Sequence, residues 1–506
     1  MDTIASSGVR QRSRAGRHGT GRGDRFVARV LSMTSPWHAR LRGATSARFV
    51  LLALALATAW LPPFGGAVCA ANADPAAAEP VAGDGRFFPY DYQVKVLPNG
   101  LTCILIPLEN PDLVAYVTVV RTGSRDEVEP GHSGFAHFFE HMMFRGTEKI
   151  SAAEYNRMHV EMGADDNAFT SDDLTCYHLV FSKEHLEEVI AAEADRFMHL
   201  SYSEQAFQKE ASTILGEYNK SAADPGFQLE EKFFETAFQS HTYGHTTMGF
   251  LRDVEGMPNQ YEYSLQFFDR FYRPDNCIVL VVGDIDPDET LALVNEHYGA
   301  WQGKAYRPSY PVEPEQKEER FCHVDYAGAS LPMLWLGYKA PAFDPARRDF
   351  AALSLLADLS FGETSALFKD LVLEKQWVEW ISADLSPHRD PHLFFIAAQI
   401  KPGIEIGAVQ ARIEQAIAEA VATPIDPARL EAMKSNMRYA FLSRLDSTRG
   451  TAMSLLSTIQ LTGGIEALET KFRTLASITP AEIQDAARTY LVPERRTVGT
   501  LTGSEQ

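Results

Sequence analysis

Residues 134–147 read GFAHFFEHMMFRGT, and the interpretation of the whole chain starts from this stretch. Its helix-forming apolar residues predict a helix, on which positions i and i+4 lie one turn apart on the same face. His137 and His141 have this spacing, so both imidazoles can reach one cation, and Glu140 borders the same face. Two neutral imidazoles suit zinc, which in hydrolytic sites takes one more protein ligand, often a carboxylate, and keeps a position for water. The stretch therefore predicts a zinc site.

Glu140 has the chemistry of a general base, because a free carboxylate beside zinc-activated water can accept its proton. The order His-x-x-Glu-His inverts the commoner zinc-peptidase motif and is typical of the inverzincins. The alternative interpretation is a core helix with two buried histidines and one exposed glutamate. Further residues at fitting positions are needed to choose between the two.

The chain has 506 residues, enough for two to four domains, but residues 1–73 are not expected to join their cores. This leader has ten arginines, no lysine and two aspartates, and it includes an apolar run at 49–61, FVLLALALATAWL. Thirteen residues are too few to span a bilayer comfortably, but they suit the core of a signal peptide. The A-x-A sequence of residues 71–73 predicts cleavage before Asp74.

Other interpretations of the leader remain open. Residues 68–70 form a second candidate cleavage site, and Met33 is an alternative start. A lipoprotein anchor on Cys69 is disfavoured because Val68 is larger than a lipobox accepts. An amphipathic organelle-targeting segment is disfavoured because the apolar block is uniform and not periodic. We expect a periplasmic or secreted protein with no stable membrane span after signal cleavage.

The charge of the mature chain limits its partners. Without residues 1–73, the remaining 433 residues carry 37 basic and 65 acidic side chains, a net charge of −28, compared with −20 for the whole chain. So acidic a balance argues against nucleic acid and anionic membranes as partners. The negative charge weakly favours basic or neutral peptides as partners. Such a charge also keeps an exported protein soluble.

Four cysteines follow the leader, and none of them has the C-x-x-C spacing of a redox or metal motif. Each lies in an apolar, strand-like stretch, which favours buried thiols, although an oxidising compartment would permit a disulfide. These residues are Cys103, Cys176, Cys277 and Cys322.

Residues 74–88 are rich in Ala, Pro and Gly and are expected to form a disordered linker. The alternating stretches before and after a Pro-Asn-Gly turn at 98–100 predict a β-hairpin. Apolar patterns downstream predict strands at 113–121, 163–170, 174–181 and 277–283, and helices at 186–199 and 204–219, with a further helix running to Phe271.

Residues 303–320 contain three prolines and a run of charges, which is typical of an interdomain linker. Beyond it we expect a strand at 331–338, helices at 346–361, 367–380 and 480–490, and a final strand at 497–501. An aromatic residue, a proline three residues later and then a strand occur near the end of both halves, which indicates a twofold repeat. The predicted fold is therefore α+β, with two homologous repeats at 89–302 and 321–506, each a mostly antiparallel sheet with helices on one face.

Five segments together resemble the insulinase, pitrilysin and mitochondrial-processing-peptidase family of zinc peptidases, in its bacterial two-domain type. The resemblance runs from about Leu97 to the C-terminus, and it is strong in the first half and diffuse in the second. In order, these segments are GFAHFFEHMMFRGT, GADDNAFTSDDLTCYH, EASTILGE, HTYGHTTMG and FYRPDNCIVLVVGDIDP.

The resemblance assigns roles to individual residues. It implies that His137 and His141 are zinc ligands and that Glu140 activates water, with one Zn²⁺ per chain. The family's third ligand is a glutamate some seventy-five residues after the motif, and Glu217 lies 76 residues beyond His141. Glu210, two helical turns earlier on the same face, resembles the outer glutamate that orients a histidine ligand. As an alternative, Glu210 and Glu217 are ordinary solvent-facing charges.

Asn167, Ala168 and Thr170 match the family's edge strand, against which a peptide substrate lies as an added strand. The alternative is a plain surface strand. The resemblance thus implies a zinc endopeptidase that cuts peptides or unfolded polypeptide segments in the cell envelope.

One departure from the family bears on assembly. Many active members place an Arg and, seven residues later, a substrate-contacting Tyr in the second half, where this chain has Val372 and Glu379. Members work in a clamshell chamber of four such units, and this chain supplies two, so the resemblance implies a dimer. We expect a heterodimer with a paralogue that carries the Arg/Tyr pair.

Two functions of a different class are weighed against the peptidase. One is a non-catalytic assembly subunit, which some relatives have become, generally with loss of the zinc residues that are present here. The other is a subunit that binds peptides without cleaving them. Zinc content tests the first alternative, and a Glu140→Gln variant tests the second.

Overall fold

The computed structural model describes residues 86–504, which belong to one compact unit. The predicted leader and signal peptide, residues 1–73, lie outside the described residues, as does most of the predicted linker at 74–88. The last residues of that linker are ordered, contrary to the prediction. Phe88 is buried, and the Phe87 ring stacks on Phe472 with 3.6 Å between centroids, because two adjacent aromatic side chains gain more from burial than Ala, Pro and Gly do.

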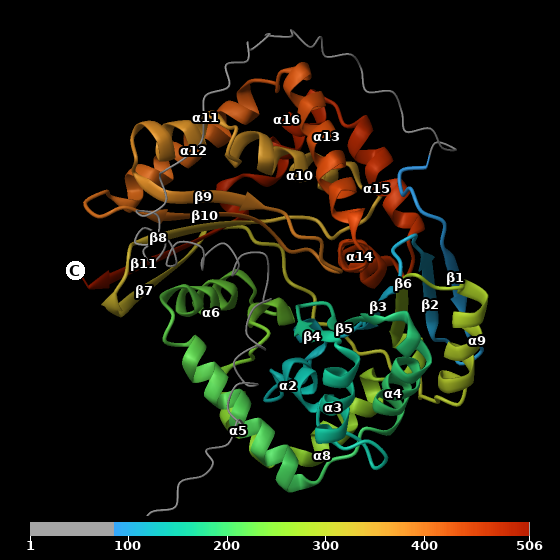
Figure 1. Cartoon of the computed structure of the whole chain (residues 1–506). Coiled ribbons are helices and arrows are strands. Elements are labelled where there is room, and N and C mark those ends of the chain that lie inside the picture. Colours follow the sequence, from blue (N-terminus) through green and yellow to red (C-terminus); the bar gives the residue numbers. More distant parts are fainter. Residues whose placement is uncertain (1–85, 505–506) are drawn as a thin grey trace, which may run out of the picture. The chain divides into compact units, whose positions relative to one another are not determined.

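The first half of the described chain, residues 86–319, carries a six-stranded sheet, and the second half, residues 320–504, a five-stranded one (Figure 1). The elements of the first half are β1 (Gln93–Val96), β2 (Thr102–Pro107), β3 (Leu113–Val120), η1 (Ser124–Asp126), α2 (Phe135–Met142), α3 (Ala152–Met162), β4 (Asp165–Thr170), β5 (Thr175–Ser182), η2 (Lys183–His185), α4 (Leu186–His199), α5 (Glu204–Ser221), α6 (Pro225–Ala237), η3 (Thr242–Gly244), α7 (Leu251–Gly256), η4 (Met257–Asn259), α8 (Tyr261–Phe271), η5 (Pro274–Asn276), β6 (Cys277–Gly283) and α9 (Pro287–Tyr298).

The elements of the second half are β7 (Arg320–Ala329), β8 (Met333–Lys339), α10 (Arg348–Phe361), α11 (Ala366–Phe368), η6 (Lys369–Glu374), β9 (Val378–Asp384), β10 (Leu393–Ile400), α12 (Ile406–Ala422), α13 (Pro427–Leu442), η7 (Ser443–Asp446), α14 (Thr448–Thr462), α15 (Glu466–Ser477), α16 (Pro480–Tyr490), η8 (Pro493–Arg495) and β11 (Arg496–Ser504).

The repeat is visible in the strand order. The first sheet runs β1-β2-β6-β3-β5-β4, and the second runs β7-β11-β8-β10-β9. Apart from the extra β1, each strand of one sheet has a counterpart at the same place in the other. The β2–β6 pair is parallel, as is its counterpart β7–β11, and the other pairs are antiparallel. The predicted α+β class with two repeated, mostly antiparallel sheets is confirmed.

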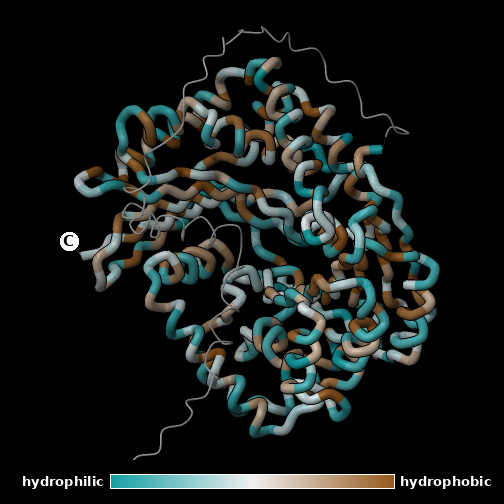
Figure 2. Tube along the Cα trace, viewed as in Figure 1, coloured by the Kyte–Doolittle hydropathy of each residue, from teal (hydrophilic) through white to brown (hydrophobic). Residues whose placement is uncertain are grey.

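Each sheet packs one face against helices of its own half, as predicted, and its other face is covered by a helix of the other half. The first sheet packs one face against α2, α4 and α5 of its own half and the other against α14 of the second half. The second sheet packs against α10, α12 and α16 of its own half and receives α6 from the first half (Figure 1). Each half thus contributes one helix to the sheet of the other half. Apolar segments run through the middle of both halves (Figure 2).

Two predicted helices are wrong in extent. The helix expected to run unbroken to Phe271 is divided into α7, η4 and α8, because Pro258 has no N–H to continue the ladder. The helix expected at 367–380 ends at Glu374, and Gln376 adopts a left-handed φ of 53°. The chain then enters β9, where Val378 and Ile381 are buried and the backbone pairs with β10. A short apolar run is compatible with a helix or a strand, and here its pairing with β10 makes it a strand.

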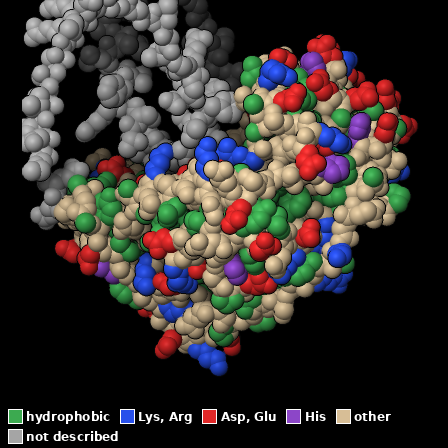
Figure 3. All heavy atoms as spheres, turned by 90° about the horizontal axis from the view of Figure 1, so that it is seen from below, with side chains coloured by type: hydrophobic (Ala, Val, Ile, Leu, Met, Phe, Trp, Pro, Cys, Tyr) green, Lys and Arg blue, Asp and Glu red, His purple; other side chains and the backbone are tan. Residues whose placement is uncertain are grey.

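All four predicted thiols are buried and free, so the disulfide alternative is not realised in this structure. None of the helices within residues 86–504 combines the length and apolarity that a membrane span requires. On the face shown in Figure 3, acidic and basic side chains are interspersed among hydrophobic ones.

Candidate metal centre

The helix that carries the motif, α2, begins at a position only glycine suits. Gly134 has a φ of 93°, and a Cβ there would lie 2.8 Å from the Met248 carbonyl oxygen. Since Gly134 has no side chain to cap the helix, the buried carboxylate of Glu127 does so, accepting the N–H groups of Gly134 and Ala136 at 2.7 Å each. The carboxyl group of Glu127 at the N-terminal end of α2 fixes where the helix starts and so where the histidines lie.

The structure brings His137, His141 and Glu217 together, as predicted. Glu217 Oε2 lies 3.6 Å from His137 Nε2 and 3.4 Å from His141 Nε2. Ligands about 2.1 Å from a tetrahedral zinc lie roughly 3.4 Å from one another, so these separations leave room for one ion among the three donors. The donor atoms belong to α2 and α5, which pack together. The residues fit a zinc ion.

Glu210 also lies where the resemblance implied, and it is buried, not exposed to solvent. Its Oε1 is 3.0 Å from His141 Nδ1, so that nitrogen carries the proton and Nε2 is left to face Glu217. Arg145 pairs with the second oxygen of Glu210. Seven residues separate Glu210 from Glu217, and two helical turns bring both to the side of α5 that faces α2.

Glu140 is buried beside the three donors, and Thr170 orients it. Thr170, the last residue of β4, donates its hydroxyl proton to Glu140 Oε2 at 2.7 Å. Burial raises the pKa of Glu140, which moves the carboxylate toward the range where it can exchange a proton. A carboxylate that is held in place and made more basic is suited to proton transfer.

The electrostatics of the histidines also suit a cation. Burial, with the neighbouring His141, lowers the pKa of His137 to about 3 and keeps that ring neutral, as a ligand must be. Burial also disfavours the charged form of His141, but its contacts with Glu210 and Glu217 outweigh this and raise its pKa to about 10. The carboxylates therefore create a strongly negative field at the point between the two rings.

The predicted edge strand is an edge strand. β4 is the last strand of its sheet, and among the described residues nothing pairs with its outer side. Ala168 and Thr170 point to the face that carries α2, while Asn167 points to the opposite face beside His178. Thr170, predicted only as a substrate residue, therefore has a second role in holding Glu140.

The positions matched to the family's Arg and Tyr lie in the second half. Val372 is in the π-helical turn η6, and Glu379 is exposed on β9. β9 is one of the two edge strands of the second sheet and is the counterpart of β4.

Sequence reasoning missed Glu127, and it did not predict that the Thr170 hydroxyl contacts Glu140. Glu127 lies seven residues before Gly134, outside the reach of any capping pattern. In the sequence, Glu127 is recognisable only as an acidic residue in the loop before α2, and acidic residues are common in loops.

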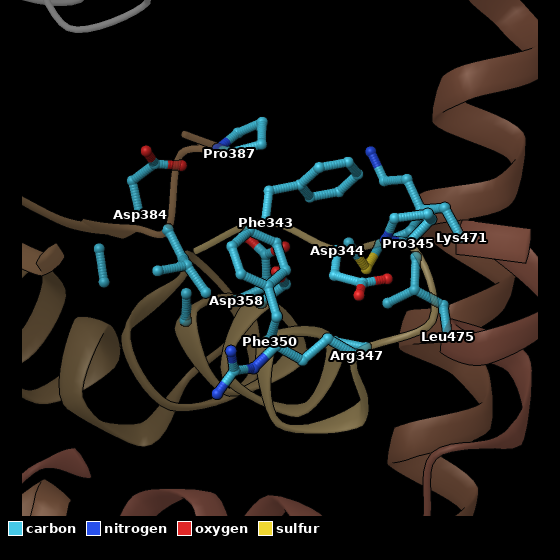
Figure 4. Close-up of a pocket in the computed structure, with 16 residues that line it drawn as sticks. Phe343, Asp344, Pro345, Arg347, Phe350, Asp358, Asp384, Pro387, Lys471 and Leu475 are labelled. Atoms are coloured by element: carbon cyan, nitrogen blue, oxygen red, sulfur yellow. The ribbon is translucent and has the colours of Figure 1, made fainter. Parts of the chain in front are cut away.

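A cavity of about 200 Å³ lies elsewhere, in the second half, and contains none of the predicted site residues. Phe343, Phe350 and Lys471 are among the side chains around it (Figure 4). The candidate metal centre is therefore a separate feature of the first half.

The two repeated α+β halves and the helix bearing His-x-x-Glu-His are features of the metallopeptidases with the inverted motif. Comparison with known proteins narrows this class. The model of the insulinase family, peptidase family M16, matches residues 105–250, and the model of the M16 inactive domain matches residues 260–437. The chain belongs to the M16 family of peptidases, in its bacterial two-domain type.

Relatives with sequence similarity are named zinc proteases. The chain is 30% identical to zinc protease PqqE of Helicobacter pylori over 367 residues, which cover 71% of this chain and 82% of that protein. It is 26% identical to the uncharacterized zinc protease YmxG of Bacillus subtilis, covering 68% and 83%. Among solved structures, a protease from Helicobacter pylori aligns with a TM-score of 0.77 and 28% identity, covering 82% of this chain and 99% of that one.

The periplasmic protease PqqL of Escherichia coli shares the fold, with a TM-score of 0.68 and 20% identity. The alignment covers 82% of this chain and 48% of PqqL. Two such two-sheet units thus fit within the length of that protein.

Proposed function

We propose that this chain is a zinc-dependent endopeptidase that hydrolyses peptides or unfolded polypeptide segments. One observation carries the proposal: Glu217 Oε2 lies within 3.6 Å of the facing nitrogens of both His137 and His141. Buried Glu140 lies beside them in reach of Thr170. Three ligands and an adjacent base are the minimum that metal-assisted hydrolysis requires.

A zinc ion held by His137, His141 and Glu217 would supply Lewis acidity, which acidifies water and polarises the scissile carbonyl. Glu140 takes the proton from the attacking water and returns it to the leaving amine. Thr170 holds the Glu140 carboxylate in place for this transfer through its hydrogen bond to Oε2. Glu210 keeps His141 in the tautomer that presents Nε2.

The free outer side of β4 supports a binding mode for the substrate. An extended peptide that pairs with Asn167, Ala168 and Thr170 would add a strand to the sheet and satisfy its backbone groups there. Thr170 lies in that strand and also touches the base, so a peptide paired with β4 would lie alongside Glu140. Recognition through the backbone suits unfolded segments of varied sequence.

A Glu140→Gln variant tests the proposed function, with Glu148→Gln on the exposed loop after α2 as the matched control. We expect Glu140→Gln to keep about one zinc per chain and to lose about 100- to 10,000-fold in turnover of a quenched peptide library. A chelator should abolish the activity of the native chain, and added zinc should restore it. Unchanged cleavage by Glu140→Gln would reject the assigned base, and absence of zinc would reject the centre.

We further propose that the active form is a dimer with a paralogous chain that carries the Arg/Tyr pair. The support is Val372 and exposed Glu379 at the matched positions, where neither side chain can donate to a developing oxyanion. Co-purification of the native protein should yield the second chain, and the mixture should exceed either chain alone in turnover. Full activity from a homogeneous preparation of this chain would reject the heterodimer.

The cell envelope is the proposed location, as a periplasmic or secreted protein. The support is the basic leader with its apolar run at 49–61 and the A-x-A sequence before Asp74. Mass spectrometry of the mature N-terminus, combined with fractionation of the producing cell, tests it. An unprocessed chain in the cytosolic fraction would reject the proposal.

A further inference from the structure

A second cluster of metal-binding side chains lies between the two halves of the chain. Asp172 follows β4 in the first half, and His388 and His392 both lie in the loop between β9 and β10 of the second. The donor atoms of the three residues all lie within 4.8 Å of one another. Donors around a tetrahedral zinc are about 3.4 Å apart, so closing this set requires shifts of no more than about 1.4 Å.

Asp172 and His388 are already oriented as metal ligands usually are. Asp172 Oδ2 lies 3.0 Å from His388 Nε2. The opposite nitrogen, Nδ1, donates to the Ser386 carbonyl at 2.9 Å, and the other oxygen of Asp172 accepts the Ser124 hydroxyl at 3.1 Å. Such outer hydrogen bonds fix the tautomer of a ligating histidine and the rotamer of a ligating carboxylate. Replacing the Nε2 proton of His388 by a cation would leave both outer bonds intact.

His392 supplies the observation that an ion pair alone does not account for. Its side chain is buried, with 9% of its surface exposed, and its ring forms no hydrogen bond within residues 86–504. The His392 ring stacks on that of His388, with 3.7 Å between ring centroids, and it also contacts the rings of Tyr243 and Phe238. A metal ion that enters from solvent would give one of its ring nitrogens a partner.

Charges of both signs surround the cluster. Four carboxylates, those of Asp172, Asp126, Asp173 and Asp390, lie together with the guanidinium groups of Arg125 and Arg389. Lys339 lies near His392 and adds a third cation, so the carboxylates outnumber the cationic side chains by one. The Asp172 side chain is 29% exposed and that of His388 11%, so an ion can enter from solvent.

We propose that Asp172, His388 and His392 form a second divalent-metal site, suited to Zn²⁺, that fastens the first half of the chain to the second. Two imidazoles and one carboxylate are a donor set that zinc prefers. Asp172 lies two residues beyond Thr170, whose hydroxyl holds Glu140, so a metal there anchors the end of the strand that orients the base. Metal binding at this site can be tested whether or not the proposed peptidase activity is correct.

The test uses the full mature chain in which His137→Gln and Glu217→Gln remove the first centre. We expect this variant to bind one equivalent of Co²⁺ or Zn²⁺, with the visible d–d bands of a low-coordinate cobalt site. Adding His392→Gln or Asp172→Asn should weaken that binding at least about 100-fold, and Ser124→Ala about 10-fold. His323→Gln is the matched control, since His323 lies on β7 and bonds to Thr500. It should leave the binding unchanged.

Thermal unfolding provides a second readout that does not depend on the visible spectrum of cobalt. Zinc should raise the Tm of the variant that lacks the first centre, and it should not do so once His388 is also replaced by Gln. A folded first-centre variant that binds no metal below about 10 µM overturns the proposal. Binding that survives Asp172→Asn and His392→Gln overturns it as well, and Asp172 with His388 is then an ion pair.

Discussion

Thr170 donates a 2.7 Å hydrogen bond to Glu140, so the edge strand β4 and the motif helix α2 meet at the proposed base. This contact links two functions that the sequence presents separately, peptide pairing along β4 and proton transfer from α2. A peptide that shifts β4 therefore also shifts the carboxylate. The proposed peptide-binding strand and the proposed base are therefore structurally coupled.

Replacing Thr170 by Val removes this hydrogen bond while keeping the β-branched shape. We expect kcat/KM to fall about 10- to 100-fold, because a hydrogen bond to a charged group contributes about 1.5–3 kcal/mol and its loss leaves Glu140 free to rotate. Zinc content should not change, since Thr170 touches no predicted ligand. The control is Thr175→Val, which faces Thr170 across the β4–β5 pair but whose hydroxyl bonds to the Thr122 carbonyl and not to Glu140. Equal losses in both variants would show a general effect on the sheet.

Glu210 positions a ligand and should act through metal affinity. Glu210→Gln breaks its charged contact with His141 Nδ1 and Arg145, and we expect zinc to bind about 10- to 100-fold more weakly. Competition with a chromogenic chelator measures this directly. At saturating zinc most of the activity should return. Glu204→Gln, exposed at the start of the same helix, is the control, and a loss of affinity there of similar size would contradict the assigned role.

The parts of the site that sequence predicts are those with fixed helical spacing. Helix geometry places His137 and His141 on one face at i+4, and Glu210 and Glu217 on one face at i+7. The roles of the two glutamates come from the family resemblance and not from this spacing. Contacts between elements do not follow in this way. The Thr170 hydroxyl reaches Glu140, and Glu127 caps α2, because of how a strand and a loop pack on that helix.

Fold prediction has the same limit. The amphipathic pattern of α6 shows that one face is buried, but it does not identify the sheet that buries it. The apolar residues at 367–380 are compatible with helix or strand, and only the partner β10 makes the last of them a strand. Asp172 and His388 lie 216 residues apart, so no spacing rule brings them together.

Helix α6 belongs to the first half but packs on the second sheet, so the two halves should unfold together. Phe233 on α6 is fully buried, with its ring 5.7 Å from Trp335 and 5.4 Å from Phe395. Phe233→Ala should cost about 3–5 kcal/mol in the free energy of unfolding, through lost transfer energy and a cavity. Urea titration should show one transition shifted to lower concentration. Phe321→Ala, at an exposed position on β7, should change stability by less than about 0.5 kcal/mol, and a larger change would contradict this account.

Glu482 stabilises the N-terminus of α16, and this stabilisation should be lost at low pH. Its bonds to Arg348, and then to Thr479 in the capping box, lower its pKa to about 2. A lowered pKa adds stability above the unfolded value of about 4.3, which is lost as pH falls through about 2. Glu482→Gln should therefore cost about 0.5–1 kcal/mol at pH 7, after solvent screening, and this difference from the native chain should shrink below pH 4.5. Urea unfolding between pH 7 and pH 3 measures it, with exposed Glu494→Gln as the control. A difference that stays constant with pH would mean that Glu482 acts through packing and not through its charge.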